Sequence, residues 1–300
     1  MPQERADTDI KTVRILVTGA NGQLGSELRV LSKNANDLAF TFVDVDDMDF
    51  RSAGSIRGFL HEKSFDFIVN TAAYTQVDEA ESNEDIAFAI NARALEVLCE
   101  VCGASGTRLI HISTDYVFDG QGHTPIRESD TPNPQSVYGR SKYEGEQIVL
   151  KQLPDAYLIR TSWLYSSFGN NFVKTISRLA GERDTLNVVA DQVGSPTYAR
   201  DLAKAIIKMV RAISQRGIDD PGIYHYANEG VASWYDLACA IVRIKGYRCV
   251  VQPIRTEEYP LAAHRPAYSV LDKRKVRTTF GLEIDNWYDA LMRCLGVSGQ

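Results

Sequence analysis

From Arg14 onward, short apolar runs rich in β-branched residues alternate with amphipathic stretches of helical length. Such alternation is typical of βαβ units that build a parallel sheet. The expected strands cover residues 14–19, 38–45, 65–70, 108–113 and 156–162, and the expected helices cover residues 23–31, 52–61, 85–102 and 136–150. The pattern therefore predicts an α/β fold with a Rossmann-type, doubly wound parallel sheet.

After Ser162 the alternation becomes less regular. Helices are expected near 172–180 and from Tyr198, Ser233 and Trp287, and strands at 185–190, 222–227 and 249–254. This pattern favours a smaller C-terminal substrate-binding lobe. We expect residues 12–162 to form an NAD(P)-binding Rossmann domain that also receives later segments of the chain. Residues 163–300 should form mainly the substrate-binding lobe, interleaved with that domain.

Composition narrows the class of protein. The 300 residues are 44% hydrophobic and 24% charged, as in ordinary globular proteins, and the net charge of -6 has no basic block that would attract nucleic acid. The first eleven residues are polar, and no later window resembles a membrane-spanning run. We therefore expect a cytoplasmic protein with no nucleic-acid or membrane partner.

The five cysteines are odd in number and follow no disulfide framework, which fits reduced thiols in a cytoplasm. Cys99 and Cys102 form a CxxC pair inside an expected helix, without a second pair to complete a zinc site. The structural interpretation of this pair is favoured over a redox or metal role. No metal site is expected.

Three glycines follow the first expected strand directly and open a helix. Gly19, Gly22 and Gly25 have the spacing GxxGxxG, which differs from the ordinary GxGxxG dinucleotide pattern. Small residues here let the backbone approach a pyrophosphate at the helix N-terminus. On spacing alone, a tight turn with close helix packing explains them nearly as well.

The end of the second strand adds support for a dinucleotide. Asp44 can accept hydrogen bonds from ribose hydroxyls and opposes a 2′-phosphate, which favours NADH, whereas Arg51 keeps NADPH open. Asp49 can hold the adenine amino group while Phe50 packs on the ring. Small residues at 72–73, after the third strand, leave room for the cofactor.

Reduction of a ketone requires a proton donor beside the developing alkoxide. Tyr138 and Lys142 are four residues apart, on one face of an expected helix. Lowering a phenol pKa from ~10 to near 7 needs about 4 kcal/mol, much of which a nearby ammonium can supply. Such a pair also arises by chance on helix surfaces. Ser113 and Thr114 end the fourth strand, where a hydroxyl can bond the substrate oxygen.

The glycine turn, the strand-end acid, the strand-end hydroxyls and YxxxK occur in the order and on the elements that a nicotinamide-dependent reductase requires. Together they resemble the extended short-chain dehydrogenase/reductase family, with TGANGQLG as the cofactor turn. The resemblance spans about residues 14–295. It narrows to the dTDP-4-dehydrorhamnose reductases through VNTAAYTQVDEAES, HISTDYVFDG, YGRSKYEGE, IRTSWLYSSFGNNFVKTI and DQVGSPTYARDLA.

The resemblance implies roles for individual residues. Tyr138 becomes the proton donor, Lys142 its partner and cofactor-ribose ligand, and Thr114 the hydroxyl of the triad. The implied cofactor-binding residues are Gly19, Gly22, Gln23, Leu24, Gly25, Asp44, Asp49, Phe50, Ala72, Ala73, Tyr74, Thr75, Tyr138 and Lys142. The implied substrate-binding residues are Val77, Thr114, Asp115, Tyr116, Trp163 and Arg265.

The implied activity is reduction of the 4-keto group of dTDP-4-dehydro-L-rhamnose, with NADPH or NADH, by a monomer or homodimer. Two alternatives remain open. One is a reductase or epimerase of another nucleotide 4-keto sugar. The other is a non-catalytic regulatory subunit with the same fold, which intact Tyr138, Lys142 and Thr114 disfavour.

Overall fold

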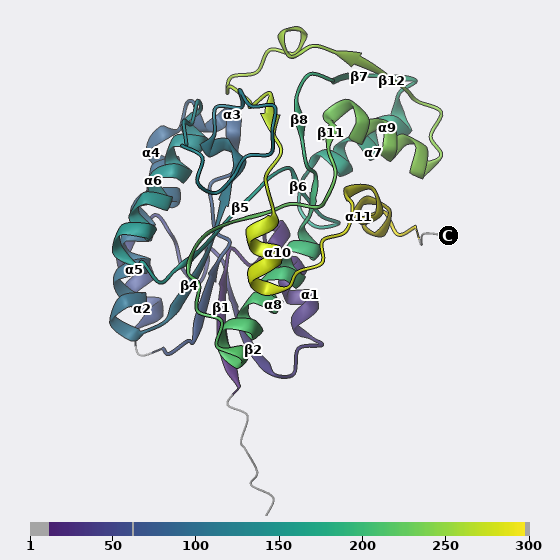
Figure 1. Cartoon of the computed structure of the whole chain (residues 1–300). Coiled ribbons are helices and arrows are strands. Elements are labelled where there is room, and N and C mark those ends of the chain that lie inside the picture. The colour runs from purple at the N-terminus through teal and green to yellow at the C-terminus, as the bar shows by residue number, and fades with distance from the viewer. Residues whose placement is uncertain (1–11, 62, 298–300) are drawn as a thin grey trace, which may run out of the picture.

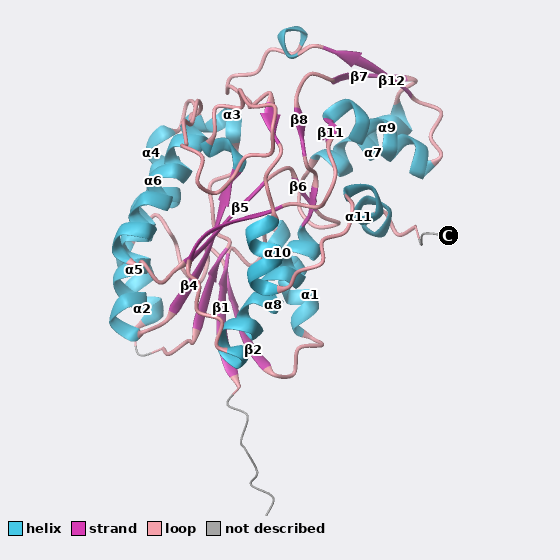
Figure 2. Cartoon of the chain, in the orientation of Figure 1, coloured by secondary structure: helices cyan, strands magenta, loops and turns pink. Residues whose placement is uncertain are grey.

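A six-stranded parallel sheet forms the centre of the protein (Figure 1, Figure 2), in the strand order β10-β5-β4-β3-β1-β2. The computed structural model describes residues 12–61 and 63–297. The polar segment 1–11 and the last three residues of the expected lobe lie outside this part. The six strands are β1 (Val13–Thr18), β2 (Leu38–Val43), β3 (Phe67–Asn70), β4 (Arg108–Thr114), β5 (Tyr157–Thr161) and β10 (Gly222–Tyr226).

Helices cover both faces of this sheet (Figure 1). One apolar cluster joins the sheet to α1 (Gln23–Ser32), α8 (Ala199–Arg216) and α10 (Arg274–Phe280). A second cluster joins it to α2 (Ala53–Leu60), α5 (Ala94–Ser105) and α6 (Val137–Gln152). The strand order reverses between β1 and β3, and such a switch point opens a crevice at the carboxyl ends of the strands. The predicted Rossmann-type sheet is confirmed.

The expected helix over 85–102 consists of three pieces. These are α4 (Glu84–Phe88), a π-helical segment (Ala89–Arg93) and α5. Asn91 lies in the π-helical segment, and its amide exchanges hydrogen bonds of 2.9 and 3.0 Å with the backbone of Tyr74. It also donates to the Ser141 hydroxyl at 3.0 Å. The irregular turn thereby fixes the loop after β3 against α6, a tertiary contact that periodicity does not reveal.

The later part of the chain builds its own apolar cluster around α7 (Phe172–Glu182), α9 (Trp234–Lys245) and α11 (Trp287–Cys294). β7 (Thr185–Val189) and β12 (Val250–Ile254) pair beside it. β10, α8 and α10, however, belong to the central layers. The boundary at residue 162 stays a prediction. Short elements complete this part: β6 (Leu164–Tyr165), β8 (Val193–Gly194), β9 (Thr197–Tyr198), β11 (Ala232–Ser233) and β13 (Tyr268–Ser269).

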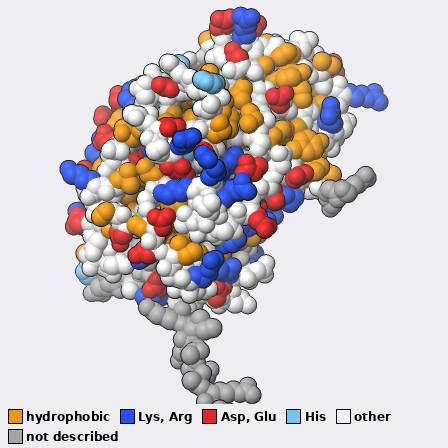
Figure 3. Space-filling model, viewed as in Figure 1, with side chains coloured by type: hydrophobic (Ala, Val, Ile, Leu, Met, Phe, Trp, Pro, Cys, Tyr) orange, Lys and Arg blue, Asp and Glu red, His pale blue; other side chains and the backbone are white. Residues whose placement is uncertain are grey.

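Acidic and basic side chains are interspersed over much of the face shown in Figure 3, and apolar side chains are frequent toward its upper part. No helix in the part of the chain that the structure describes has the length and apolarity needed to cross a membrane.

Candidate active site

A cleft of about 1080 Å³ lies at the carboxyl ends of the strands and extends to residues of the later part of the chain. It brings together most of the residues that the sequence predicts for the site. Those that line it are Gly19, Gly22, Gln23, Leu24, Asp44, Asp49, Phe50, Ala72, Ala73, Tyr74, Thr75, Val77, Thr114, Asp115, Tyr116, Tyr138, Lys142 and Trp163. Two predicted residues, Gly25 and Arg265, are absent from its lining.

The glycine turn fits a pyrophosphate. Gly19 has a φ of +63°, and a Cβ there would lie 2.7 Å from the backbone of Ala72. Gly22 is the N-cap of α1 and provides no side-chain cap, so the first N–H groups of the helix remain available to an anion at the cleft. A Cβ on Gly25 would lie 2.5 Å from the Gly19 carbonyl oxygen. Gly25 therefore serves the close packing of α1 against the turn.

The acids after β2 are held by the loop that carries them. Asp44 accepts the backbone N–H groups of Asn21 at 2.7 Å and Val45 at 2.9 Å. Asp49 accepts the Arg51 guanidinium at 2.8 to 3.1 Å, and this pair holds the pKa of the Asp49 carboxyl below its usual range. The pair lines the cleft together with Phe50, so a cation stands close to the expected adenosine end of the site.

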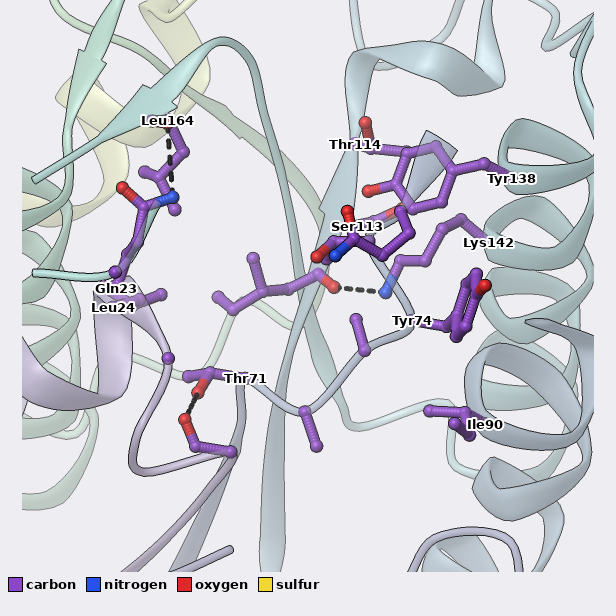
Figure 4. A pocket seen from close by; sticks show the side chains of 18 of the residues that line it. Gln23, Leu24, Thr71, Tyr74, Ile90, Ser113, Thr114, Tyr138, Lys142 and Leu164 are labelled. Atoms are coloured by element: carbon purple, nitrogen blue, oxygen red, sulfur yellow. Dashed lines mark hydrogen bonds between the residues drawn. The ribbon is translucent and has the colours of Figure 1, made fainter. Parts of the chain in front are cut away.

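Tyr138 and Lys142 enter the cleft from the first turns of α6 (Figure 4). Ser136 is the N-cap of this helix, and its hydroxyl accepts the Gly139 N–H at 3.1 Å. This cap sets where the helix starts and so which face carries the pair. Lys142 donates from Nζ to the Ile112 carbonyl at 2.7 Å, and the Tyr138 ring packs edge-on against Tyr116 with centroids 5.4 Å apart.

The electrostatics of this pair differ from the sequence expectation. Burial raises the pKa of Tyr138 to about 12, and a hydrogen bond with Thr114 offsets part of that rise. Burial lowers the pKa of Lys142 to about 8, against the attraction of Glu146. The expected lowering of the phenol pKa toward 7 is therefore not seen in the protein alone, because burial outweighs the hydrogen bond with Thr114. At neutral pH Tyr138 holds its proton.

Hydroxyl and carboxyl groups at the end of β4 surround the phenol. Thr114 caps a short 3₁₀ helix (Asp115–Val117) and donates to Asp115 at 3.1 Å. Burial raises the pKa of Asp115 to about 7. The hydroxyls of Ser113 and Thr161 are buried and have no hydrogen-bond partner among the described residues. Both residues line the cleft, as is expected where a ligand supplies the missing partner.

Trp163 forms a wall of the cleft and is the one non-glycine residue with positive φ, +48°, among residues 12–61 and 63–297. Its ring stacks on Trp234 with centroids 3.6 Å apart and planes 4° apart. A Cβ on Gly194 would lie 2.7 Å from the Trp163 ring. Non-glycine residues in this conformation cluster at ligand sites. Trp234 also lines the cleft, and sequence reasoning missed it because only the fold brings α9 beside Trp163.

Arg265 forms an ion pair with Asp78 and is not among the residues that line the cleft. Its guanidinium contacts both carboxylate oxygens of Asp78, at 2.6 and 3.0 Å, and the Ala263 N–H donates to the same carboxylate at 3.1 Å. Asp78 lies on α3 (Val77–Ala80), next to the predicted substrate contact Val77. Arg265 therefore joins the segment after β12 to the helix beside the substrate end of the cleft.

A loop between β6 and α7 lines the cleft next to Gln23. Asn171 caps α7 and donates from Nδ2 to the Gln23 side-chain oxygen at 3.0 Å, while Gln23 donates to the Leu164 carbonyl at 3.5 Å. Gly169, Asn170 and Asn171 line the cleft but were given no role from the sequence. Their clustering in SSFGNN, just before an expected helix, is a signal that could have identified them.

None of the five cysteines, all of which the structure describes, lines the cleft. Cys99 and Cys102 are buried, and burial raises the pKa of each thiol to about 12. Thiols with such pKa values are poor nucleophiles and metal ligands at neutral pH. Among the described residues no group of three or more His, Cys, Asp or Glu side chains is arranged to hold a metal ion.

The family model described as the RmlD substrate binding domain matches residues 13–298. The chain belongs to the RmlD substrate-binding domain family. Within it, the chain is 39% identical over 284 residues to the dTDP-4-dehydrorhamnose reductase of Aggregatibacter actinomycetemcomitans, covering 93% of this chain and 97% of that protein. It is 41% identical to a probable dTDP-4,6-dihydroxy-2-methyloxan-3-one 4-ketoreductase of Streptomyces antibioticus, covering 93% of each.

A solved structure of this RmlD family gives the same fold. The dTDP-4-dehydrorhamnose reductase of Bacillus anthracis, crystallised in complex with NADP, superposes with a TM-score of 0.89 at 37% identity. The match covers 95% of this chain and 99% of that one. The family resemblance expected from the sequence is thereby confirmed.

Proposed function

We propose that this chain reduces the 4-keto group of dTDP-4-dehydro-L-rhamnose to give dTDP-L-rhamnose, with NADPH or NADH as reductant. The observation that carries the proposal is the convergence of Thr114, Tyr138 and Lys142 beside a glycine turn in one cleft. Membership of the RmlD family and 37–39% identity to two proteins named dTDP-4-dehydrorhamnose reductase support it.

A reduced nicotinamide bound in this cleft would supply a hydride, with its electron pair, to the C4 carbon of the sugar. The carbonyl π electrons then move to oxygen, and the oxygen takes the phenolic proton of Tyr138. Because an alkoxide is a far stronger base than a phenolate, this transfer is downhill even from a phenol with a pKa of about 12. The raised pKa keeps Tyr138 in the protonated form that a donor needs.

The neighbouring residues receive roles in the same proposal. Thr114 bonds the substrate oxygen, and Lys142 holds the cofactor ribose and balances the phenolate left by proton transfer. Gly19, Gly22 and the start of α1 hold the pyrophosphate. Trp163 and Trp234 form the wall against the nucleotide-sugar, and Tyr116 packs beside the reacting sugar. Residues 12–162 would thus supply most of the cofactor site and residues 163–300 most of the lobe.

A coupled assay tests the proposal. The upstream enzymes generate the 4-keto sugar, and absorbance at the reduced nicotinamide band is followed after this chain is added. Oxidation of NADPH or NADH with formation of dTDP-L-rhamnose is expected. If the cofactor binds but no hydride is transferred to any sugar in a panel, the chain is a non-catalytic subunit and the proposal is wrong.

A second substrate is favoured by one observation. The Streptomyces relative, named for a different keto sugar, is as similar to this chain as the rhamnose enzymes are. Turnover of another dTDP-4-keto sugar, at a higher kcat/KM than the rhamnose precursor, would move the proposal to that sibling activity. Comparing thymidine- and uridine-linked sugars in the same assay tests the base preference.

The proposal also includes a cytoplasmic location and a monomer or homodimer. Free cysteines throughout the described part of the chain support a reducing compartment. Light scattering of the purified protein, compared with the 33.4 kDa mass of one chain, tests the assembly.

A further inference from the structure

Three polar residues form a row across the central sheet beneath Lys142. Thr18, Asn70 and His111 are register neighbours on β1, β3 and β4. Each is nearly or fully buried, with relative exposure of 1% or less. The residues two positions earlier on these strands are Leu16, Ile68 and Leu109, which belong to the apolar core of the same face. The row is therefore a buried polar layer at the carboxyl edge of that core.

The orientation of the Asn70 amide is fixed by its neighbours. Its Oδ1 accepts the Thr18 hydroxyl at 2.6 Å and the Ala72 backbone N–H at 3.2 Å. A backbone N–H can only donate, so the atom facing it must be the oxygen. The amide nitrogen, Nδ2, then faces Nδ1 of His111 at 3.0 Å.

This amide orientation also fixes the proton of His111. An amide nitrogen can only donate, so Nδ1 must accept and carries no proton. The pKa of His111 lies well below its usual range, because burial and the charge of Lys142 both disfavour the imidazolium. The neutral ring therefore carries its one proton on Nε2. That atom lies 3.3 Å from Nζ of Lys142.

We propose that Asn70 and His111 are positioning residues that present an N–H, rather than a lone pair, to Nζ of Lys142. A neutral amine at Nζ has a lone pair that can accept this N–H. An ammonium has only N–H donors, so it cannot form a hydrogen bond with the N–H of His111. The row thereby holds down the proton affinity of Lys142 while fixing its place beside Tyr138. The catalytic consequence rests on the proposed reductase function; the hydrogen-bond assignment does not.

Other charged and titratable groups also lie near Lys142. Glu146, one turn further along α6, attracts the ammonium. It is already bonded to Arg160 on β5, at 2.9 and 2.6 Å, in a pair that is almost completely buried. Tyr138 and Asp115 line the same cleft. Arg160 offsets part of the negative charge of Glu146, and the Ile112 carbonyl accepts an N–H from either form of Lys142. The N–H of His111 is the hydrogen-bond donor that faces Nζ, and only the neutral amine can accept it.

Histidine side-chain NMR tests the assignment directly, without turnover. Long-range ¹H–¹⁵N spectra distinguish the two neutral tautomers, and His225 is an internal control. His225 is also buried, but its Nδ1 lies 3.1 Å from the Ile126 carbonyl, which can only accept. We expect the Nε2–H tautomer at His111 and the Nδ1–H tautomer at His225. An Nδ1–H tautomer or an imidazolium at His111 between pH 6 and 8 would overturn the proposal.

Asn70→Asp tests the effect on Lys142. A carboxylate at this position accepts from Nδ1, so the ring proton moves there and Nε2 offers a lone pair to the ammonium. We expect the pKa of Lys142, followed by ¹³Cε NMR, to rise by about one unit or more. The alkaline limb of kcat/KM should rise with it, because activity is lost as pH passes the pKa of Lys142.

The double variant Asn70→Asp/His111→Leu separates the added charge from the imidazole. It keeps the new carboxylate but lacks the ring, so only the smaller part of the Lys142 shift should remain. The full shift in the double variant would show that charge alone is responsible, and would refute the positioning role. Absence of turnover in the wild type would instead contradict the proposed function and leave the tautomer result standing.

Discussion

Nζ of Lys142 donates to the Ile112 carbonyl at 2.7 Å, although Lys142 lies one helical turn from Tyr138 on the same face of α6. The two side chains share the cleft, but the ammonium is bonded to the neighbouring strand. Burial raises the pKa of Tyr138 to about 12, so the phenol is protonated at neutral pH. In the proposed reaction, Lys142 contributes after proton transfer, when a phenolate has to be stabilised beside it.

Tyr138→Phe should lower kcat by about 10²- to 10⁴-fold, because the alkoxide loses its proton donor while the ring and its packing remain. Cofactor affinity, measured by quenching of protein fluorescence, should change little. Tyr143→Phe is the matched control, since Tyr143 lies on the same helix but packs with Val117 and Phe118 outside the cleft lining. Equal turnover by Tyr138→Phe and the wild type would refute the assigned role.

Gly19→Ala should weaken cofactor binding and destabilise the fold. The added methyl meets the Ala72 backbone at 2.7 Å, and the φ of +63° adds about 1–2 kcal/mol of strain. Gly217→Ala separates the two effects, because Gly217 has a φ of +66° but no atom within 4 Å of the added Cβ. Chemical unfolding should show strain in both variants, and cofactor titration should show lost affinity in Gly19→Ala alone. Normal cofactor affinity in Gly19→Ala would contradict the assigned turn.

Asp115 should make the fold less stable as pH rises. Its folded pKa of about 7 lies above the unfolded value of 3.8, so the native state binds the extra proton in that window. The free energy of unfolding then falls between about pH 4 and pH 7, by at most roughly 4 kcal/mol at about 1.4 kcal/mol per unit. Asp115→Asn removes this dependence. The free energy of unfolding of Asp115→Asn minus that of the wild type, both from urea unfolding, should be more favourable at pH 8 than at pH 4. The same difference at both pH values would contradict the raised pKa of Asp115.

The Asp78–Arg265 pair should affect substrate binding by holding the segment after β12 against α3. If Arg265 only ties its segment to α3, Arg265→Ala raises the substrate KM several-fold while cofactor affinity is kept. The exchanged pair Asp78→Arg/Arg265→Asp should then recover much of the loss, because the ion pair is rebuilt with reversed polarity. If the guanidinium instead binds the substrate diphosphate, the exchanged pair stays as weak as Arg265→Ala. Steady-state kinetics of the three variants decides between the two.

The fold was largely predictable because its main elements are local patterns. β-branched runs gave the strands of the central sheet to within about two residues, and the spacing of Tyr138 and Lys142 placed both side chains on one helix face. Contacts between distant segments were not predictable. The stacking of Trp163 on Trp234 depends on tertiary docking. The direction of the Lys142 hydrogen bond depends on strand register, which apolar alternation does not specify at the polar ends of the strands.

Arg51 should decide between the two nicotinamide cofactors. Its guanidinium lies beside Asp49 at the cleft and is 59% exposed, so it can turn toward a 2′-phosphate without breaking a buried contact. Asp44 acts in the opposite direction, since its carboxylate repels that phosphate and bonds a free ribose hydroxyl instead. Arg51→Ala should therefore lower kcat/KM for NADPH by about tenfold, equivalent to about 1.4 kcal/mol, and leave the value for NADH nearly unchanged.

Arg57→Ala is the control for the Arg51 prediction, because Arg57 pairs with Glu100 and neither residue lines the cleft. Raising the salt concentration should lower the wild-type kcat/KM for NADPH more than that for NADH, because the Arg51 contact with the 2′-phosphate is exposed and screened. A loss of the same size with both cofactors would show that Arg51 acts through Asp49 and the adenine pocket, and would contradict a role in phosphate recognition.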